Sequence, residues 1–321
     1  MKRRQVIYGI ATVVPGIHRL WAGHTGGTDS ARYCYSVWLR HLVMAKRNGL
    51  NPCPKVVAEL GPGDSLGVGL AALISGCDKY VACDVIAYAN AERNVRIFDA
   101  LVTLFRNREN IPGNEEFPRV RPHLPTYAFP AEVLDESRLE YALAGSRLQR
   151  IRDAIEARTH EDAPIQYAAP WYDVGAVDKE SADMVYSQSV LQQVDDLRVV
   201  YAAMHAWLKP TGFMSHEIDF KCHGTAEEWN GHWAYSDLTW RLIRGRRPYL
   251  LNREPHSTHM AILNEKGYQV VCDLTVKSAS RLTPREVAPR FRSMSRDDLT
   301  ISSAFIQAVK RNHRPANDQR V

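Results

Sequence analysis

Apolar side chains recur at helical spacing early in the chain and in short unbroken runs further on. Between residues 30 and 46 they recur at every third or fourth position, which predicts a helix that Asp29 or Ser30 could cap. Residues 55–60 form a short apolar run that stops at Gly61-Pro62-Gly63. This pattern predicts a buried strand that ends at a glycine turn.

A small-residue helix and a second strand follow the glycine turn. Residues 65–75 are small and apolar and end at Gly76, whereas residues 79–85 predict a strand that Asp84 terminates. A strand, a helix and a second strand are the opening unit of a doubly wound sheet.

Residues 89–160 are too many for an ordinary crossover between parallel strands. The pattern predicts a helix up to about residue 107, a proline-rich loop over 111–130 and then a second helix. We therefore interpret residues 107–163 as a helical insertion.

The alternation of strands and helices resumes after this insertion. A second insertion over residues 221–255 is aromatic and basic, and the tail over residues 312–321 is expected to be loose. The remaining predicted elements are strands at 165–168 and 184–187, a helix at 195–208, a strand at 213–220, a helix at 258–266 and strands near 269–276 and 301–309. A turn at Lys209-Pro210-Thr211-Gly212 is predicted to separate the first of these helices from the strand after it.

These elements predict one α/β domain over residues 1–321, a doubly wound Rossmann-like sheet with helical insertions. Residues 1–50 are expected to form a helical cover. The 321 residues, 45% hydrophobic and 24% charged, have the composition of a folded globular protein. A net charge of +5 over this length does not by itself indicate a nucleic-acid surface.

Cysteine usage and the first residues bear on location. The six cysteines include no Cys-x-x-Cys pair, which is typical of reduced thiols in a cytoplasmic protein.

The uncharged run over residues 5–17 is too short to span a bilayer. Because basic residues precede it, the run imitates a signal peptide, although no clean small-x-small cleavage site follows. The alternatives are a helix that packs on the body or a loose membrane-surface contact.

The strongest motif is Glu59-Leu60-Gly61-Pro62-Gly63-Asp64-Ser65, with Asp84 standing 21 residues after Gly63. Glycines at the end of a first strand let a ligand approach the backbone, and an acidic residue after the second strand can accept the hydroxyls of a ribose. A dinucleotide fingerprint would need a third glycine where this chain has Leu66. The motif predicts a nucleoside site, the alternative being a strand-to-helix turn without a ligand.

An acidic residue two positions before the first glycine favours a cationic ligand with an amino group over a pyrophosphate. At this point residues 55–310 resemble the class I S-adenosylmethionine-dependent methyltransferases, whose motif reads acidic-x-Gly-x-Gly. The resemblance includes Val190-Leu191-Gln192-Gln193-Val194, which reads Val-Leu-Glu-His-Val in many relatives. The two glutamines depart from that pattern.

The resemblance implies S-adenosyl-L-methionine as cofactor and a role for each matching position. Glu59 would lie near the methionine amino group, Gly61 and Gly63 beneath the cofactor, and Asp84 at the ribose hydroxyls. The other expected cofactor contacts are Asp64 and Val85 beside these positions, Tyr167 and Ala168 at the adenine, and Ser187 and Gln188 beside the donor methyl.

Methyl transfer to a hydroxyl needs alignment and a base. The candidates are His216 as the leading base, Asp219 and His223, in and after the strand at 213–220. His216 could equally be a structural histidine, and alternation along the strand points it away from Glu217 and Asp219. The nearby Trp229, Trp233 and Tyr235 suit a sugar, and the segment is similar to methyltransferases of bacterial glycan-assembly loci.

Other chemistry is less well supported by the sequence. Neither the residues around His216 nor His256-x-x-His259 has a recognised ligand spacing, so no metal is predicted. The basic run at 241–247 could hold the phosphate of a nucleotide-linked or lipid-linked acceptor, or be a solvated helix face. The Asn-Pro-Pro-aromatic segment of exocyclic-amine methylation is absent at residues 186–189, which disfavours nucleic acid.

Three functions stay open on this basis. The sequence favours a methyltransferase that acts on a small polar or glycan-type acceptor at a hydroxyl. The alternatives are an RNA or protein methyltransferase and a non-catalytic relative that binds S-adenosylmethionine. The sequence does not indicate the oligomeric state.

Overall fold

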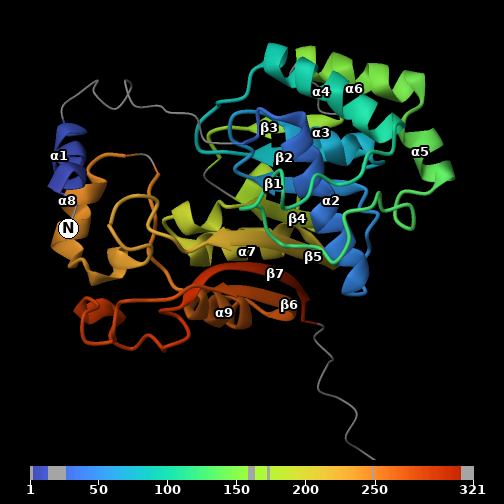
Figure 1. The fold of residues 1–321 in the computed structure, drawn as a ribbon. Helices are drawn as coiled ribbons and strands as arrows, with labels where there is room; N and C mark the ends of the chain where they lie inside the picture. Colours follow the sequence, from blue (N-terminus) through green and yellow to red (C-terminus); the bar gives the residue numbers. More distant parts are fainter. Residues whose placement is uncertain (1–2, 14–26, 158–162, 172–173, 248, 312–321) are drawn as a thin grey trace, which may run out of the picture.

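The computed structural model describes residues 3–13, 27–157, 163–171, 174–247 and 249–311 (Figure 1). The expected loose tail at 312–321 lies outside the described residues, as do residues 14–26 of the expected N-terminal cover.

A seven-stranded sheet in the order β3-β2-β1-β4-β5-β7-β6 forms the centre of the described chain. Strands β1 to β5 pair in parallel, and β7 runs antiparallel between β5 and β6. The strands are β1 (Val56–Leu60), β2 (Lys79–Cys83), β3 (Ile165–Ala168), β4 (Ala182–Gln188), β5 (Leu208–Asp219), β6 (Tyr268–Lys277) and β7 (Ile301–Lys310). The predicted α/β fold, a doubly wound Rossmann-like sheet, is confirmed.

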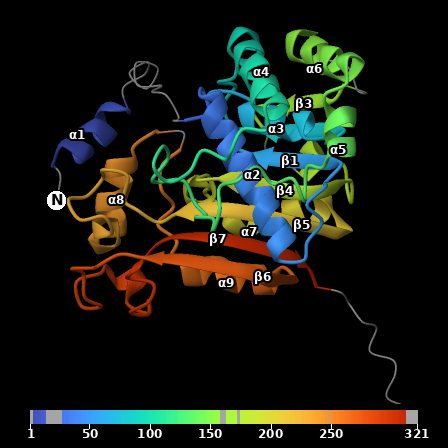
Figure 2. The same ribbon diagram turned by 45° about the vertical axis from the view of Figure 1, so that its right-hand side comes forward.

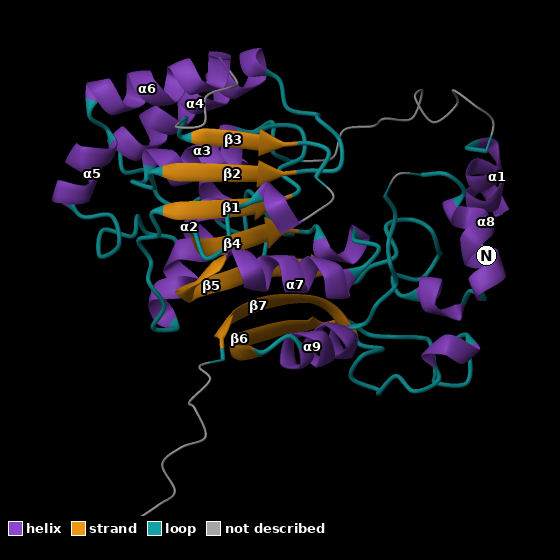
Figure 3. Ribbon diagram, turned by 180° about the vertical axis from the view of Figure 1, so that it is seen from behind, coloured by secondary structure: helices purple, strands orange, loops and turns teal. Residues whose placement is uncertain are grey.

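Helices cover both faces of this sheet (Figure 3). The core on one face includes residues of α2, α3, α4 and α6, and the core on the other includes residues of α7 and α9. The helices are α1 (Arg3–Ala11), α2 (Ala31–Arg47), α3 (Gly67–Ile74), α4 (Ala91–Arg106), α5 (Glu136–Ala142), α6 (Gly145–Ala157), α7 (Leu197–Trp207), α8 (Asp237–Arg244) and α9 (His256–Glu265). None of these described helices has the length and apolar character needed to cross a bilayer.

Helix α2 lies within residues 1–50, the expected N-terminal cover, and packs on one face of the sheet. This helix crosses β1, β4 and β5 in Figure 2, and the ring of its Trp38 lies 5.5 Å from that of Tyr186 in β4. Ser30 caps the helix by accepting a hydrogen bond from the Tyr33 N–H, as the sequence predicts. Helix α1 lies apart from the sheet, against α8 (Figure 1).

The first insertion contains a long irregular segment, held by a buried arginine of α2. The Arg40 guanidinium donates to the carbonyls of Pro112, Val120 and Pro122 at 2.8 to 3.1 Å. A charge buried in this way is tolerated because its N–H groups are satisfied. The loop therefore lies along α2, and helices α5 and α6 complete the insertion.

One sequence prediction is wrong in detail. The turn predicted at Lys209-Pro210-Thr211-Gly212 lies inside β5, which begins at Leu208. Leu208 pairs with Ala182, and the next pair joins Phe213 to Met184, so a bulge accommodates the extra residues. Proline has no N–H to donate. It is tolerated at a bulge because the bulged residues are not hydrogen-bonded to the neighbouring strand.

The packing of α3 on β2 gives a testable prediction. A Cβ on Gly69 would lie 2.0 Å from the Tyr80 ring, so Gly69→Ala should overpack the core and lower the free energy of unfolding by about 1–3 kcal/mol. Gly145, the first residue of α6, has no atom within 4 Å of such a Cβ, and Gly145→Ala should not destabilise. Urea unfolding measures both; equal stability of the two variants would contradict the packing.

Candidate nucleoside and acceptor site

The sheet has a topological switch point between β1 and β4, since the chain builds toward β3 on one side and toward β6 on the other. Ligands of doubly wound sheets bind outside the carboxyl ends of the strands at such a point. Here the turn after β1 meets the segment after β4: a Cβ on Gly61 would lie 2.6 Å from Cγ2 of Val190. Only glycine fits, because Gly61 also has φ of +64°.

Asp84 is fixed to the glycine turn by main-chain hydrogen bonds. Its Oδ2 accepts from the Gly63 N–H at 3.2 Å, and its Oδ1 accepts from the Val85 N–H at 2.7 Å. Burial raises the pKa of the Asp84 carboxyl, and these N–H groups oppose the shift. A carboxylate offers about four lone-pair sites, so Asp84 retains the capacity to accept a ligand hydroxyl.

The expected adenine contacts lie at the ends of β2 and β3. The Asp84 N–H donates to the Ala168 carbonyl at 3.0 Å, and the Tyr167 hydroxyl donates to the Ile86 carbonyl at 3.4 Å. The Val85 side chain is 44% exposed and offers apolar surface directly after Asp84. The structure therefore brings Val85, Tyr167 and Ala168 to the same edge of the sheet as Asp84.

Glu59 lies inside the protein, below the turn. Its Oε2 accepts hydrogen bonds from the Tyr80 hydroxyl at 2.5 Å and the Tyr186 hydroxyl at 3.1 Å. Burial raises the pKa of Glu59 to about 7. The hydrogen bonds from the two tyrosines and from the backbone of Gly69 in α3 lower the pKa and offset part of this rise. The carboxylate thus joins β1 to β2, β4 and the start of α3.

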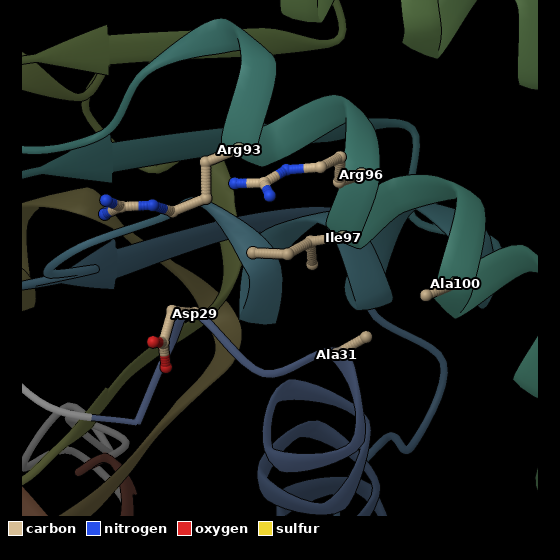
Figure 4. A pocket seen from close by; sticks show the side chains of 6 residues that line it. All are labelled: Asp29, Ala31, Arg93, Arg96, Ile97 and Ala100. Carbon is tan, nitrogen blue, oxygen red and sulfur yellow. The ribbon is translucent and has the colours of Figure 1, made fainter.

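A cavity of about 380 Å³ lies beside the turn, between the start of α2 and α4 (Figure 4). In Figure 4 the side chains of Arg93 and Arg96 extend from α4 on one side of the cavity, and Asp29 lies on the other side with its carboxylate directed away from them. Arg93 Nη1 donates to the Asp64 carbonyl at 2.7 Å, so the main chain of Asp64 anchors this arginine. The cavity adjoins the turn on the side of Asp64; Asp84 is not among its lining residues.

Ser187 and His216 form a pair inside the sheet. The Ser187 Oγ lies 2.8 Å from His216 Nδ1, and both side chains are fully buried. Burial lowers the pKa of His216 to about 3, and the nearby His41 and His259 add to the shift. Its Nε2 has no hydrogen-bond partner within the described part of the chain. His216 therefore lies in a core position and is neutral at neutral pH.

The opposite face of β4 and β5 carries Gln188 and Glu217. Glu217 Oε2 accepts from the Ser189 hydroxyl at 2.5 Å and from Gln188 Nε2 at 3.4 Å. Burial raises the pKa of Glu217 to about 7, opposed by the Ser189 hydrogen bond. Strand alternation placed Glu217 on the same face as Asp219, but Glu217 was not among the catalytic residues predicted from the sequence.

Gln188 also begins a buried polar chain that sequence reasoning missed. Its Oε1 lies 3.3 Å from Nε2 of His41 in α2, and His41 Nδ1 lies 2.7 Å from Ser215 Oγ. Gln307 Nε2 donates to the same Ser215 hydroxyl at 3.0 Å. These residues lie far apart in the sequence, and the only signal was a histidine within an apolar helix. These hydrogen-bonded side chains fix α2 against the strands that lead to the site.

Asp219 and His223 meet at the carboxyl end of β5, where both side chains are partly exposed. His223 Nε2 lies 3.2 Å from Asp219 Oδ2, and Lys221 Nζ lies 3.0 Å from Asp219 Oδ1. Burial raises the pKa of Asp219, but the hydrogen bond from His223 and the charge of Lys221 outweigh it and lower the pKa to about 2. The structure thus brings together two of the three predicted catalytic residues and separates them from His216.

The aromatic residues of the second insertion mainly brace it. Trp233 is buried, and its Nε1 donates to the Arg253 carbonyl at 2.9 Å. Trp229 Nε1 donates to the Ala279 carbonyl at 2.7 Å, and the Tyr235 hydroxyl donates to the Thr225 carbonyl at 3.1 Å. These contacts hold the loop that carries His223.

No group of three or more potential metal ligands occurs among the described residues. The two histidines of His256-x-x-His259 have separate partners, Asp273 at 2.9 Å and the Tyr201 hydroxyl at 2.9 Å.

No protein-family model matches the chain, and neither does any curated protein. Solved structures that it resembles include a phosphoethanolamine N-methyltransferase 2 of Haemonchus contortus in complex with S-adenosyl-L-methionine, with 15% identity over 86% of this chain and 53% of that one, at a TM-score of 0.41. Another is a geranyl diphosphate C-methyltransferase of Streptomyces coelicolor A3(2), with 10% identity over 84% and 76% and a TM-score of 0.42. A third is an S-adenosylmethionine-dependent methyltransferase of Mesorhizobium loti, with 12% identity over 79% and 90% and a TM-score of 0.35.

The buried histidines give a prediction for the pH dependence of stability. Burial lowers the pKa of His216, His232 and His259 to about 3 and that of His41 to about 4. A histidine neutral in the folded state and protonated in the unfolded state stabilises fully above its unfolded pKa of about 6.5, and this contribution is lost as the pH falls below it. Glu59 and Glu217 act in the opposite direction between about pH 4.5 and 7, but they are fewer.

The free energy of unfolding should therefore fall as the pH is lowered from about 7.5 to about 5, with each buried histidine contributing about 1–2 kcal/mol. His259→Gln should reduce this dependence, whereas the same change at the exposed His123 should alter it much less. Urea unfolding at several pH values measures the slope. A stability that rises as the pH is lowered would contradict the assignment.

Proposed function

We propose that the chain is an S-adenosylmethionine-dependent methyltransferase that acts on a small polar or glycan-type acceptor at a hydroxyl. The observation that carries this proposal is the attachment of the Asp84 carboxylate to the glycine turn at the switch point of the sheet. An acidic group held there by main-chain N–H groups suits a ribose. The free cysteines agree with a cytoplasmic location, which we include in the proposal.

The residues at the turn fit the nucleoside part of this cofactor. Asp84 would accept the ribose hydroxyls, and Val85 with Tyr167 would flank the adenine. Gly61 and Gly63 leave the backbone open to close approach, since both have positive φ. When bound, S-adenosylmethionine supplies an electrophilic methyl group on its sulfonium.

Glu59 has a different part in this proposal from the one that the resemblance implied. Its carboxylate is engaged by Tyr80 and Tyr186, so we assign it to holding the turn in place from below. Asp64 would help through its carbonyl, which fixes Arg93. Ser187 would likewise act within the sheet, through its contact with His216.

We assign the role of general base to His223, with Asp219 as its orienting partner. A histidine can take the proton of a hydroxyl at neutral pH, and a carboxylate 3.2 Å from Nε2 fixes the imidazole ring and leaves Nδ1 for the acceptor. His216 is less suited because it is fully buried and its low pKa makes it a weak base. Gln188 and Glu217 lie on the same face as Asp219 and would contact neighbouring hydroxyls of the acceptor.

The cofactor site is tested by Asp84→Ala and a matched control. Titration calorimetry with S-adenosylhomocysteine should show affinity roughly ten- to hundred-fold weaker, because hydrogen bonds to a charged group are lost. Asp78 precedes the same strand at its other end, and Asp78→Ala should bind normally. Unchanged binding by Asp84→Ala would remove the ribose assignment.

The base is tested by turnover on a panel of sugars and sugar nucleotides, followed as release of S-adenosylhomocysteine. His223→Ala should lower the rate by about 10²–10⁴-fold while cofactor affinity stays unchanged, and Asp219→Asn should lower it less. His216→Gln should retain most of the activity. The reverse order, with His216→Gln inactive and His223→Ala active, would contradict this assignment; release with an RNA or protein acceptor alone would contradict the acceptor class.

A further inference from the structure

Helices α1 and α8 form a pair that stands away from the sheet. In Figure 3 the arrowheads of β1, β2 and β3 point toward this pair, and Figures 1 and 2 also place the two helices side by side. The pair therefore projects on the side of the molecule that carries the proposed site. Gln5 of α1 reaches that side directly, because its Nε2 donates to the carbonyl of Gly224, next to His223.

The pair is held by backbone contact. A Cβ on Gly9 would lie 1.9 Å from the carbonyl oxygen of Leu242, and one on Gly245 would lie 2.0 Å from that of Gly9. The Arg246 N–H donates to the Thr12 hydroxyl at 2.8 Å. Two glycines thus allow an approach that side chains would prevent, and the outward surface of the pair is fixed.

This outward surface is apolar. Ile7 is 63% exposed and Leu238 is 69% exposed. Five of the twelve exposed large hydrophobic side chains of the described residues lie on this pair, namely Ile7, Tyr8, Ile10, Leu238 and Leu242, and Val13 follows just after α1. Scattered exposed hydrophobics need no explanation, but a concentration on two small helices indicates an interaction surface.

The same two segments carry a net positive charge. Residues 3–13 and 237–247 carry six arginines and one acidic residue, Asp237, and that aspartate pairs with Arg253 at 2.7 Å. Arg4, Arg241 and Arg246 are exposed and form no ion pair with another residue of the described chain. Arg244 is the exception, since it pairs with Asp195.

We propose that the paired helices α1 and α8 dock on the surface of an anionic lipid bilayer. Exposed isoleucine and leucine suit the boundary between headgroups and acyl chains, and the arginines suit anionic headgroups. A nucleic acid would match the charge but would leave the apolar centre uncovered. This inference goes beyond the proposed function and does not depend on it.

The test uses the full chain with vesicles and needs no acceptor. Co-sedimentation should show binding to vesicles of phosphatidylglycerol and phosphatidylcholine, little binding to phosphatidylcholine alone, and loss of binding at high salt. Arg4→Gln and Arg241→Gln should each weaken binding about five-fold, and Ile7→Ser with Leu238→Ser should weaken it at least ten-fold.

Matched controls lie elsewhere on the surface. Val199 of α7 is 56% exposed, and Val199→Ser should leave vesicle binding unchanged, as should Arg285→Gln in an exposed loop. Because the altered side chains are exposed, the variants should fold, which circular dichroism and urea unfolding would check. Absence of vesicle binding would overturn the proposal. It would also be overturned by binding that survives the Ile7→Ser and Leu238→Ser changes, or by a dimer that those changes dissociate.

Discussion

One buried carboxylate supports the arrangement of the candidate site. Glu59 of β1 accepts hydrogen bonds from Tyr80 of β2 and Tyr186 of β4, and the backbone of α3 at Gly69 adds to its stabilisation. A charged or protonated carboxyl at this depth is tolerated only when its oxygens are satisfied, so the two hydroxyls and α3 have to stay where they are. The glycine turn lies directly after this junction, and its position beside the end of β2 follows from it.

The two faces of β5 differ: one contributes side chains to the buried core, and the other contributes side chains to the proposed acceptor site. His216 and Ser187 point into the core on the side of α7 and α9, where burial keeps the imidazole neutral. Glu217 and Asp219 point to the other side, where the strand ends and His223 is partly exposed. A shift of one residue in strand register would exchange these two sets, and the bulge in β5 fixes the register.

The succession of strands and helices along the chain and the glycine turn could be predicted because they follow from local patterns: short apolar runs, a turn of two glycines and Asp84 at the end of the next strand. Period-two alternation also indicated correctly that His216 and Asp219 face opposite ways. The partners of Glu59 could not be predicted, because Tyr80 and Tyr186 meet it only through sheet pairing. The polar chain through His41 and the pairing of α1 with α8 likewise depend on contacts between segments distant in the sequence.

A crystal structure of the chain with S-adenosylhomocysteine would test the central claim most directly. We expect the ribose hydroxyls within hydrogen-bond distance of the Asp84 carboxylate, the adenine against Val85, and the sulfur directed toward the end of β5 and His223. The account would be contradicted by a nucleoside bound away from Asp84, for example in the cavity between α2 and α4 that Arg93 and Arg96 line.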